Sequence, residues 1–139
     1  MATDPATIDG DAAREKLERL VRESLRQRRD DQLAEAEGTL RRALELAERA
    51  WGRRSPQSAL VLADLGRCRV ADGRFEAAEA AYRQALDIER GVNGAPSLQV
   101  GVLLHDLAVV CEALGRESEA TELWAEGRAL FEQKEQAGT

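Results

Sequence analysis

Apolar residues recur along the middle of this chain with the 3.6-residue period of an α-helix. One helix is predicted to begin at Ser55, a favoured N-cap residue, with Pro56 at its first position, where a missing N–H is tolerated. The pattern breaks from Ala71 to Arg74, where Gly73 can adopt the left-handed conformation that ends a helix. A second helix is predicted from Phe75 to about Gly91. The pattern therefore indicates two helices joined by a tight turn.

This helix pair is one copy of a repeat. Ala36, Ala78 and Ala120 are spaced 42 residues apart, and Gly73 and Gly115 keep the same spacing. One equivalent position carries a large apolar residue in every copy, namely Leu40, Tyr82 and Trp124. A repeat of this length cannot bury its apolar side alone, so we expect it to stack on its neighbours.

The repeat divides the chain into three helix pairs, and no sustained period-2 alternation indicates a strand. We therefore predict an all-α fold, an α-solenoid of three stacked antiparallel helix pairs. In the first pair, Arg29-Asp30-Asp31 stands where a glycine turn is expected. The first pair is predicted at Ala12–Arg28 and Gln32–Ala50, and the third runs from Ser97 to about Gln133. The predicted organisation is a flexible leader at residues 1–10 and a single domain at 11–135, with repeats at about 12–52, 55–94 and 97–134.

The repeated positions resemble those of the tetratricopeptide repeat (TPR) family. That family places Leu and a small residue in the first helix, Gly before the second helix, and then a small, an aromatic and another small residue. The middle repeat matches at Leu65, Gly66, Gly73, Ala78, Tyr82 and Ala85, and the last at Leu107, Ala108, Gly115, Ala120, Trp124 and Gly127. The first matches more loosely at Leu20, Ser24, Ala36, Leu40 and Ala43. The period exceeds the usual length of about 34 and is similar to that of the kinesin-light-chain type.

The resemblance implies a non-enzymatic adaptor that binds a peptide or a partner protein in a concave groove. In this family the first helix of every pair lines the groove. Carried over by position, its residues are Val21, Leu25, Arg28, Leu60, Ala63, Asp64, Arg67, Val70, Val102, His105, Asp106, Val109 and Glu112. Members that clamp a peptide's C-terminal carboxylate carry Lys, Asn and Arg where this chain has Val21, Leu25, Val102 and Asp106, so no such clamp is expected. The paired Asn of the kinesin-light-chain type is likewise replaced, by Ala63-Asp64 and His105-Asp106.

The acidic residues of this predicted groove leave two interpretations open. Asp64 and Asp106 can favour a peptide, extended or helical, that carries apolar anchors and a Lys or Arg. Alternatively, both carboxylates pair with Arg67 and other nearby arginines and only solvate the surface.

The last helix suggests an alternative function, that of a structural subunit. Long repeat arrays usually finish with a polar capping helix, and none is predicted after the last apolar stripe. The chain would then homo-oligomerise, or dock to a larger complex, through an uncapped C-terminal helix. The possible interface residues are Leu123, Trp124, Leu130 and Phe131. In the opposing interpretation, Trp124, Leu130 and Phe131 turn inward onto the preceding pair.

Composition narrows the classes of partner. The formal net charge is -6, and the basic residues are spread along the chain, so neither nucleic acid nor an anionic membrane surface is expected as a partner. No apolar run approaches the ~20 residues of a membrane span, and the N-terminus lacks the features of a signal peptide. We predict a cytoplasmic protein, and the preference for Ala and for Arg over Lys fits a bacterial source.

Few residues in the sequence are candidates for a catalytic or metal-binding site. Cys68 and Cys111 are far apart, lack metal-ligand spacing, and are expected to be reduced thiols in helices. His105 is the single histidine. Asp64 and Asp106 recur one repeat apart, but two carboxylates on neighbouring helices do not by themselves make a catalytic site. We therefore predict no catalytic residue, no metal site and no cofactor.

Overall fold

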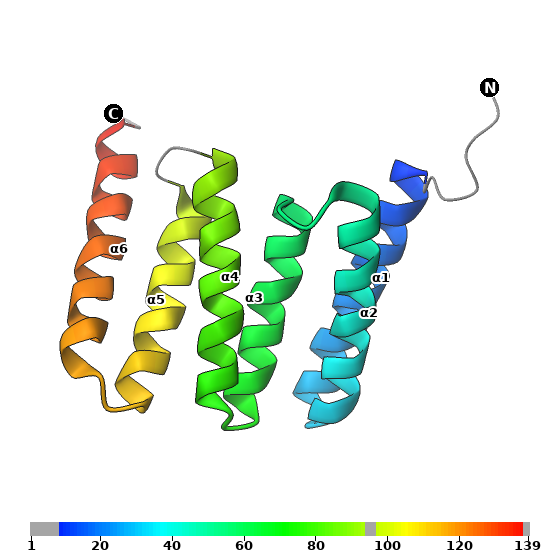
Figure 1. Ribbon diagram of the computed structural model, residues 1–139, viewed down its shortest axis with the longest axis horizontal. Coiled ribbons are helices and arrows are strands. Elements are labelled where there is room, and N and C mark those ends of the chain that lie inside the picture. Colours follow the sequence, from blue (N-terminus) through cyan, green and yellow to red (C-terminus); the bar gives the residue numbers. More distant parts are fainter. Residues whose placement is uncertain (1–8, 94–96, 138–139) are drawn as a thin grey trace.

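A computed structural model describes residues 9–93 and 97–137, which form six α-helices and no strand. The helices are α1 (Gly10–Arg29), α2 (Leu33–Trp51), α3 (Pro56–Ala71), α4 (Phe75–Asn93), α5 (Leu98–Ala113) and α6 (Glu117–Ala137). They stand side by side in chain order, with α1 and α2 at one end and α6 at the other (Figure 1). Each helix packs on the next one in the sequence, and α1 also touches α3. The fold is the predicted all-α solenoid.

The first helix of each pair begins after a residue whose side chain caps it. The side chains of Ser55 and Ser97 accept a hydrogen bond from a backbone N–H in the first turn of α3 and of α5. Asp9 does the same for α1, which begins at Gly10 rather than at the predicted Ala12. Residues 1–8 of the predicted leader lie outside the described residues. Helices α4 and α6 also continue past their expected ends, to Asn93 and Ala137.

The turns inside the pairs each contain one residue with a positive φ. Gly73 and Gly115 have φ angles of 73° and 81°, as expected for glycines that end a helix. In the first pair Asp31 has a φ of 61°. Asp enters this region more readily than most non-glycine residues, so the turn forms without glycine.

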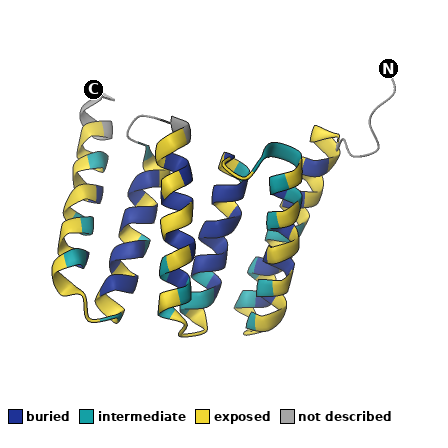
Figure 2. Ribbon diagram, in the orientation of Figure 1, coloured by how far each residue is buried: buried dark blue, intermediate teal, exposed yellow. Residues whose placement is uncertain are grey.

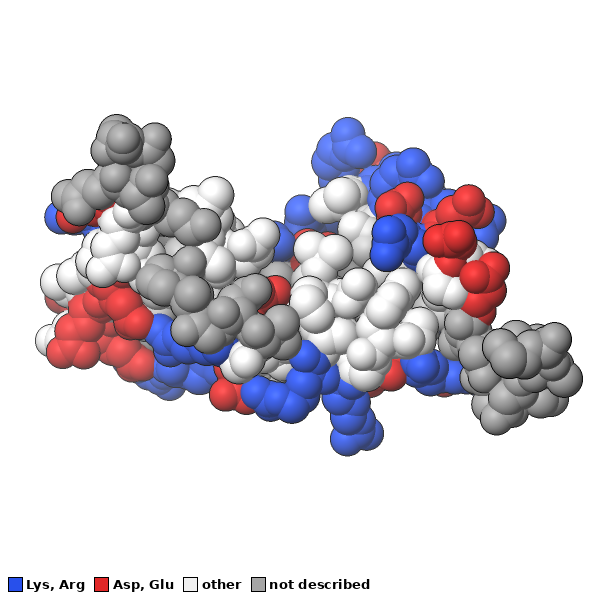
Figure 3. Space-filling view, turned by 90° about the horizontal axis from the view of Figure 1, so that it is seen from above, with Lys and Arg blue, Asp and Glu red and all other residues white. Residues whose placement is uncertain are grey.

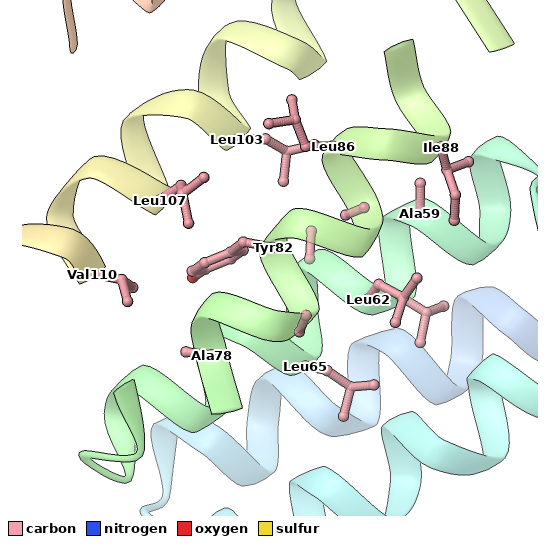
Figure 4. Close-up of a cluster of buried hydrophobic side chains, with 14 of the residues drawn as sticks. Ala59, Leu62, Leu65, Ala78, Tyr82, Leu86, Ile88, Leu103, Leu107 and Val110 are labelled. Carbon is pink, nitrogen blue, oxygen red and sulfur yellow. The ribbon is translucent and has the colours of Figure 1, made fainter. Parts of the chain in front are cut away.

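The core runs between the two helices of each pair and between consecutive pairs, and α3 and α5 are buried along most of their length (Figure 2). Gly66 of α3 faces the ring of Tyr82 of α4 at close range. A Cβ at Gly66 would lie 2.5 Å from Tyr82 Cε1. The Tyr82 side chain is only 2% exposed and extends toward Leu107 of α5 (Figure 4). The small residue and the aromatic residue of the repeat therefore belong to one packing unit.

Ion pairs at equivalent positions link consecutive repeats. Glu37 of α2 pairs with Arg74, and Glu79 of α4 pairs with Arg116 at 2.6 Å. The two glutamates are one repeat apart, and so are the two arginines. Burial alone would raise the pKa of each glutamate, but hydrogen bonds from arginines, Arg74 and Arg116 among them, outweigh it. The pKa of both carboxyls is held below its ordinary value of 4.5.

The sign of these shifts predicts an acid-sensitive contribution to stability. A carboxyl with a lowered folded-state pKa stabilises the fold above its unfolded-state pKa, and this contribution is lost as pH falls through the folded-state pKa. Glu79→Gln is therefore expected to lower the free energy of unfolding by roughly 1 kcal/mol at pH 7 and by much less near pH 3. Urea melts at both pH values measure the difference. Glu122→Gln, at an exposed position of α6, is the matched control and is expected to change neither melt. An equal loss for Glu79→Gln at both pH values would contradict the assignment.

Candidate protein-binding groove

A hollow of about 450 Å³ opens between the first turns of α3 and α5. Leu60 of α3 and Leu98 and Val102 of α5 stand at its edges, with 49%, 51% and 41% of their surface exposed. The lining residues are Pro56, Gln57, Ala59, Leu60, Ala63, Arg67, Glu89, Leu98, Gln99, Val102 and Leu103. Figure 3 shows the molecule from the side on which α3 and α5 begin. The outline seen from there is indented between two uncharged areas. The hollow combines an apolar wall with polar groups at its edge.

Two neighbouring hollows extend this one toward α1. One of about 330 Å³ is lined by Leu17, Glu18, Val21, Arg22 and Leu60. The other, of about 670 Å³, is lined by Leu25, Arg28, Arg29, Arg67, Val70, Ala71 and Tyr82. Leu60 and Arg67 each line two of the three hollows. We call the three together the groove, and it crosses the first helix of each pair.

Arg67 connects α3 to α5 beside the groove. Its guanidinium donates to Asp64 at 2.9 Å on the same helix and to Asp106 at 3.0 Å on α5. The Asp64 side chain is 10% exposed, and that of Asp106 is 22% exposed. Burial raises the pKa of Asp64 and outweighs the opposing effect of Arg67. The pKa of Arg67 is also raised, because the two carboxylates outweigh its burial. Of the two interpretations of these aspartates, the structure shows the pairing with Arg67.

Arg28 and Arg29 give the other end of the groove a positive charge. Both line the hollow of about 670 Å³ at the end of α1. Within residues 9–93 and 97–137, neither arginine forms an ion pair. Arg28 is close enough to Asp64 to lower the pKa of that carboxyl. Of the described residues, three arginines, Arg28, Arg29 and Arg67, and no acidic residue line this hollow, so the charge that it presents to a ligand is basic.

The predicted groove residues fall into two groups. Those that line the three hollows are Val21, Leu25, Arg28, Leu60, Ala63, Arg67, Val70 and Val102. Asp64 and Asp106 are held by Arg67, His105 lines a separate hollow between α5 and α6, and Val109 and Glu112 are exposed outside all of these hollows. A binding role for each of these residues stays a prediction.

Sequence reasoning missed one end of the groove. Pro56, Gln57, Leu98 and Gln99 belong to the first turns of α3 and α5 and line the hollow there. Leu98 precedes Val102 by four residues, which places both on one face of α5. This four-residue spacing could have indicated from the sequence that Leu98 lines the groove together with Val102.

The interface residues predicted on the last helix differ in exposure. Leu123, Trp124 and Leu130 are half-buried and pack against the core. Phe131 is 41% exposed, and its ring covers Gly101 of α5, where a Cβ would lie 2.9 Å from Phe131 Cζ. Trp124 and Leu130 therefore turn inward, as one interpretation expected, whereas Phe131 keeps a large part of its surface free.

One cluster has the composition of a metal site. The ligand atoms of Glu79, Cys111 and Glu119 lie within 4.8 Å of one another. Arg83 and Arg116 donate hydrogen bonds to these glutamates. Burial also raises the pKa of the Cys111 thiol, which disfavours the thiolate that binds metals. A cation there would face two guanidinium groups, so the cluster is better described as an ion-pair network.

Two further features concern the cysteines and the apolar length of the helices. Cys68 and Cys111 are buried free thiols, as the sequence predicted. Among the described residues, no helix is both long and apolar enough to cross a membrane.

Comparison with known proteins decides the family. The sequence model of the tetratricopeptide repeat matches residues 25–90 and 71–133, which together span most of the chain. The chain belongs to the tetratricopeptide repeat family. TPR proteins of this kind are typically non-enzymatic scaffolds, and their fold generally mediates protein–protein interaction. The chain is 32% identical over 95 residues to the human "Tetratricopeptide repeat protein 19, mitochondrial", covering 68% of this chain and 24% of that protein. It therefore spans about a quarter of this curated relative.

Solved structures show the same TPR fold at low identity. BtubC (BKLC) from P. vanneervenii superposes with a TM-score of 0.81 and 19% identity, covering 91% of this chain and 49% of that one. The "Podosopora anserina putative kinesin light chain nearly identical TPR-like repeats" superposes with a TM-score of 0.75 and 21% identity, over 85% and 55%. The TPR domain of Arabidopsis FLU gives 0.73 and 18%, over 87% and 98%. These likenesses support the architecture of the solenoid.

Proposed function

We propose that this TPR protein is a non-enzymatic adaptor that binds a segment of a partner protein in the groove across α1, α3 and α5. Residues 11–135 would act as one domain of three repeats. The observation that carries the proposal is the exposure of Leu60, Leu98 and Val102 around one hollow. Large apolar side chains that gather at one hollow are typical of interaction sites, whereas isolated ones are ordinary.

The charges of the groove favour a partner segment with apolar anchors and acidic residues. Asp64 and Asp106 both accept hydrogen bonds from Arg67, whose positive charge offsets part of theirs, so their attraction to a Lys or Arg of a ligand is reduced. Arg28 and Arg29 form no ion pair within the described residues, so their positive charge is available to a ligand. Apolar anchors would occupy the hollow between α3 and α5, and a carboxylate would approach the end of α1. This is the opposite ligand charge to that of the first of the two interpretations that the sequence left open.

The proposal predicts which surface substitutions abolish binding. Peptides selected by display against the wild-type protein serve as probes. Leu60→Glu and Val102→Glu are each expected to weaken their binding by about 30-fold or more, because a charge would be buried against the apolar anchors. Titration calorimetry measures the loss.

Ala80→Glu is the matched control, since it adds the same charge to an exposed alanine of α4, away from the groove. It is expected to leave the affinity unchanged. An equal loss for Ala80→Glu and Val102→Glu would contradict groove binding. Selected peptides rich in Lys and Arg rather than Asp and Glu would contradict the charge preference while leaving the groove itself supported.

The proposal also places the protein in the cytoplasm, without a nucleic-acid or membrane partner. The human relative is named as a mitochondrial protein, so location needs its own test. Imaging of a fluorescent fusion in the source cells is expected to show diffuse cytoplasmic signal, and an organellar or membrane-bound signal would contradict this part.

A further inference from the structure

Tyr82 carries a hydroxyl that its packing does not use. The ring lies against Gly66, and the side chain is only 2% exposed. The hydroxyl lies at the end of the ring farthest from α4 (Figure 4). Within residues 9–93 and 97–137, it forms no hydrogen bond. Leu40 and Trp124, at the equivalent positions of the other repeats, have no hydroxyl. The hydroxyl is therefore a feature of the middle repeat alone.

This hydroxyl opens into one hollow of the groove. Tyr82 lines the hollow of about 670 Å³ together with Arg28, Arg29 and Arg67, and we call it the basic hollow. In the described part of the chain, no completely enclosed side-chain nitrogen or oxygen of a buried residue lacks a hydrogen-bond partner. Since the Tyr82 hydroxyl has no partner, it is not completely enclosed and must reach the hollow. A polar group in this position is available to a ligand.

The Tyr82 hydroxyl is suited to donate a hydrogen bond. Burial, with a smaller contribution from Asp106, raises the pKa of the phenol above its ordinary value of 10. The phenol therefore keeps its proton at neutral pH, and its O–H can donate to an anionic oxygen. Hydrogen bonds from a neutral donor to a charged acceptor are stronger than those between neutral groups.

The charges around the hydroxyl favour a ligand with a single negative charge. Arg28, Arg29 and Arg67 line the basic hollow. Asp64 and Asp106, both held by Arg67, lie close enough to act on the same hydroxyl. Three arginines and two aspartates leave one positive charge unbalanced. A carboxylate would balance it, whereas a phosphate group, with a charge of about −2 at pH 7, would leave the cluster negative.

We infer that Tyr82 is a ligand-binding residue of the groove, whose hydroxyl donates a hydrogen bond to an Asp or Glu carboxylate of the bound partner segment. This assignment rests on the proposed function and ties the acidic residue of the partner to the basic hollow. Arg28 and Arg29 attract the carboxylate, and the Tyr82 hydroxyl fixes its position. Arg67 lines both the basic hollow and the hollow between α3 and α5, so one segment can occupy both.

Tyr82→Phe tests the hydrogen bond without disturbing the packing, because phenylalanine keeps the ring beside Gly66. It is expected to leave the urea melt unchanged, since the hydroxyl has no partner in the described fold. Its affinity for an acidic peptide selected by display against the wild type is expected to fall about tenfold. Titration calorimetry measures the loss.

The control peptides carry Asn or Gln in place of one acidic residue at a time. At one position, which we call the contact position, this change is expected to weaken binding to the wild type and to remove the difference between wild type and Tyr82→Phe. Tyr82 is the single tyrosine of the chain, so tyrosine labelled with carbon-13 at Cζ gives one NMR signal from the site. The acidic peptide is expected to shift this signal more than the peptide neutralised at the contact position.

The outcomes separate this assignment from groove binding itself. Peptides that lose affinity with Leu60→Glu and Val102→Glu, but bind Tyr82→Phe as tightly as wild type, would overturn the assignment and leave groove binding supported. Peptides that bind all three variants as tightly as wild type would contradict groove binding, and the assignment with it. A peptide with phosphoserine at the contact position is expected to bind more weakly than one with glutamate. Tighter binding that depends on Tyr82 would overturn carboxylate as the ligand.

Discussion

Replacing Arg67 by methionine is expected to lower the free energy of unfolding at pH 7 by about 2–4 kcal/mol. Methionine keeps much of the aliphatic packing of arginine but removes the charge that Asp64 and Asp106 share. Asp64 has 10% of its side chain exposed, so its carboxylate would lose its hydrogen-bonded partner without regaining water. Removing one partner of a largely buried ion pair costs more than the intact pair contributes, because a charge stays buried and unpaired.

The pH dependence of this loss distinguishes it from a simple packing defect. Burial already raises the pKa of Asp64 in the wild-type protein, and without Arg67 the pKa is expected to rise further. A carboxyl with a raised folded-state pKa binds protons more strongly when folded, so it destabilises the fold less as pH falls. The difference between Arg67→Met and wild type is therefore expected to shrink between pH 7 and pH 4 in urea melts. The combined variant with Asp64→Asn and Asp106→Asn is the control and is expected to recover most of the loss at pH 7. A loss that is constant with pH would contradict the ion-pair account.

Gly66→Ala is expected to destabilise the protein by about 1–3 kcal/mol, although alanine is normally the better helix former. The added Cβ would lie 2.5 Å from the ring of Tyr82, closer than van der Waals contact allows. The ring cannot move away easily, because it is 2% exposed and extends toward Leu107 of α5. The strain would therefore reach the interface between the middle and the last repeat.

Gly38→Ala is the matched control for this substitution. Gly38 also lies inside a helix, α2, but it is exposed, and a Cβ there would meet nothing within 4 Å. It is expected to stabilise the protein by about 0.5–1 kcal/mol. Thermal or urea melts of both variants measure the contrast. Two changes of the same sign would contradict the packing role assigned to Gly66.

The fold was predictable because the same pattern of residues occurs in three copies, so each copy supports the helices predicted in the other two. The spacing of Ala36, Ala78 and Ala120 placed the second helix of each pair, and Gly73 and Gly115 placed two of the turns. The helix ends were less predictable, because they depend on local caps. Asp9 extends α1 toward the N-terminus by two residues more than the apolar pattern indicates.

The groove was predictable in outline but not in charge. The repeat shows that Asp64 and Asp106 occupy equivalent positions, and it leaves open which cation reaches them. Arg67 reaches Asp106 across 39 residues of sequence, which depends on how α3 and α5 stack rather than on either helix alone. The same limit applies to Arg28 and Arg29, whose importance follows from the acidic residues being already paired.

Site-specific photo-crosslinking tests the central claim most directly. A photoreactive phenylalanine analogue is placed at Val102 in the groove or at Ala80 on α4, and the protein is irradiated with an acidic, apolar peptide selected by display against the wild type. The account predicts a crosslink from position 102 and none from position 80, and mass spectrometry locates the joined residue on an apolar anchor of the peptide. Crosslinking from position 80 with none from position 102 would contradict the account, because the peptide would then bind outside the groove.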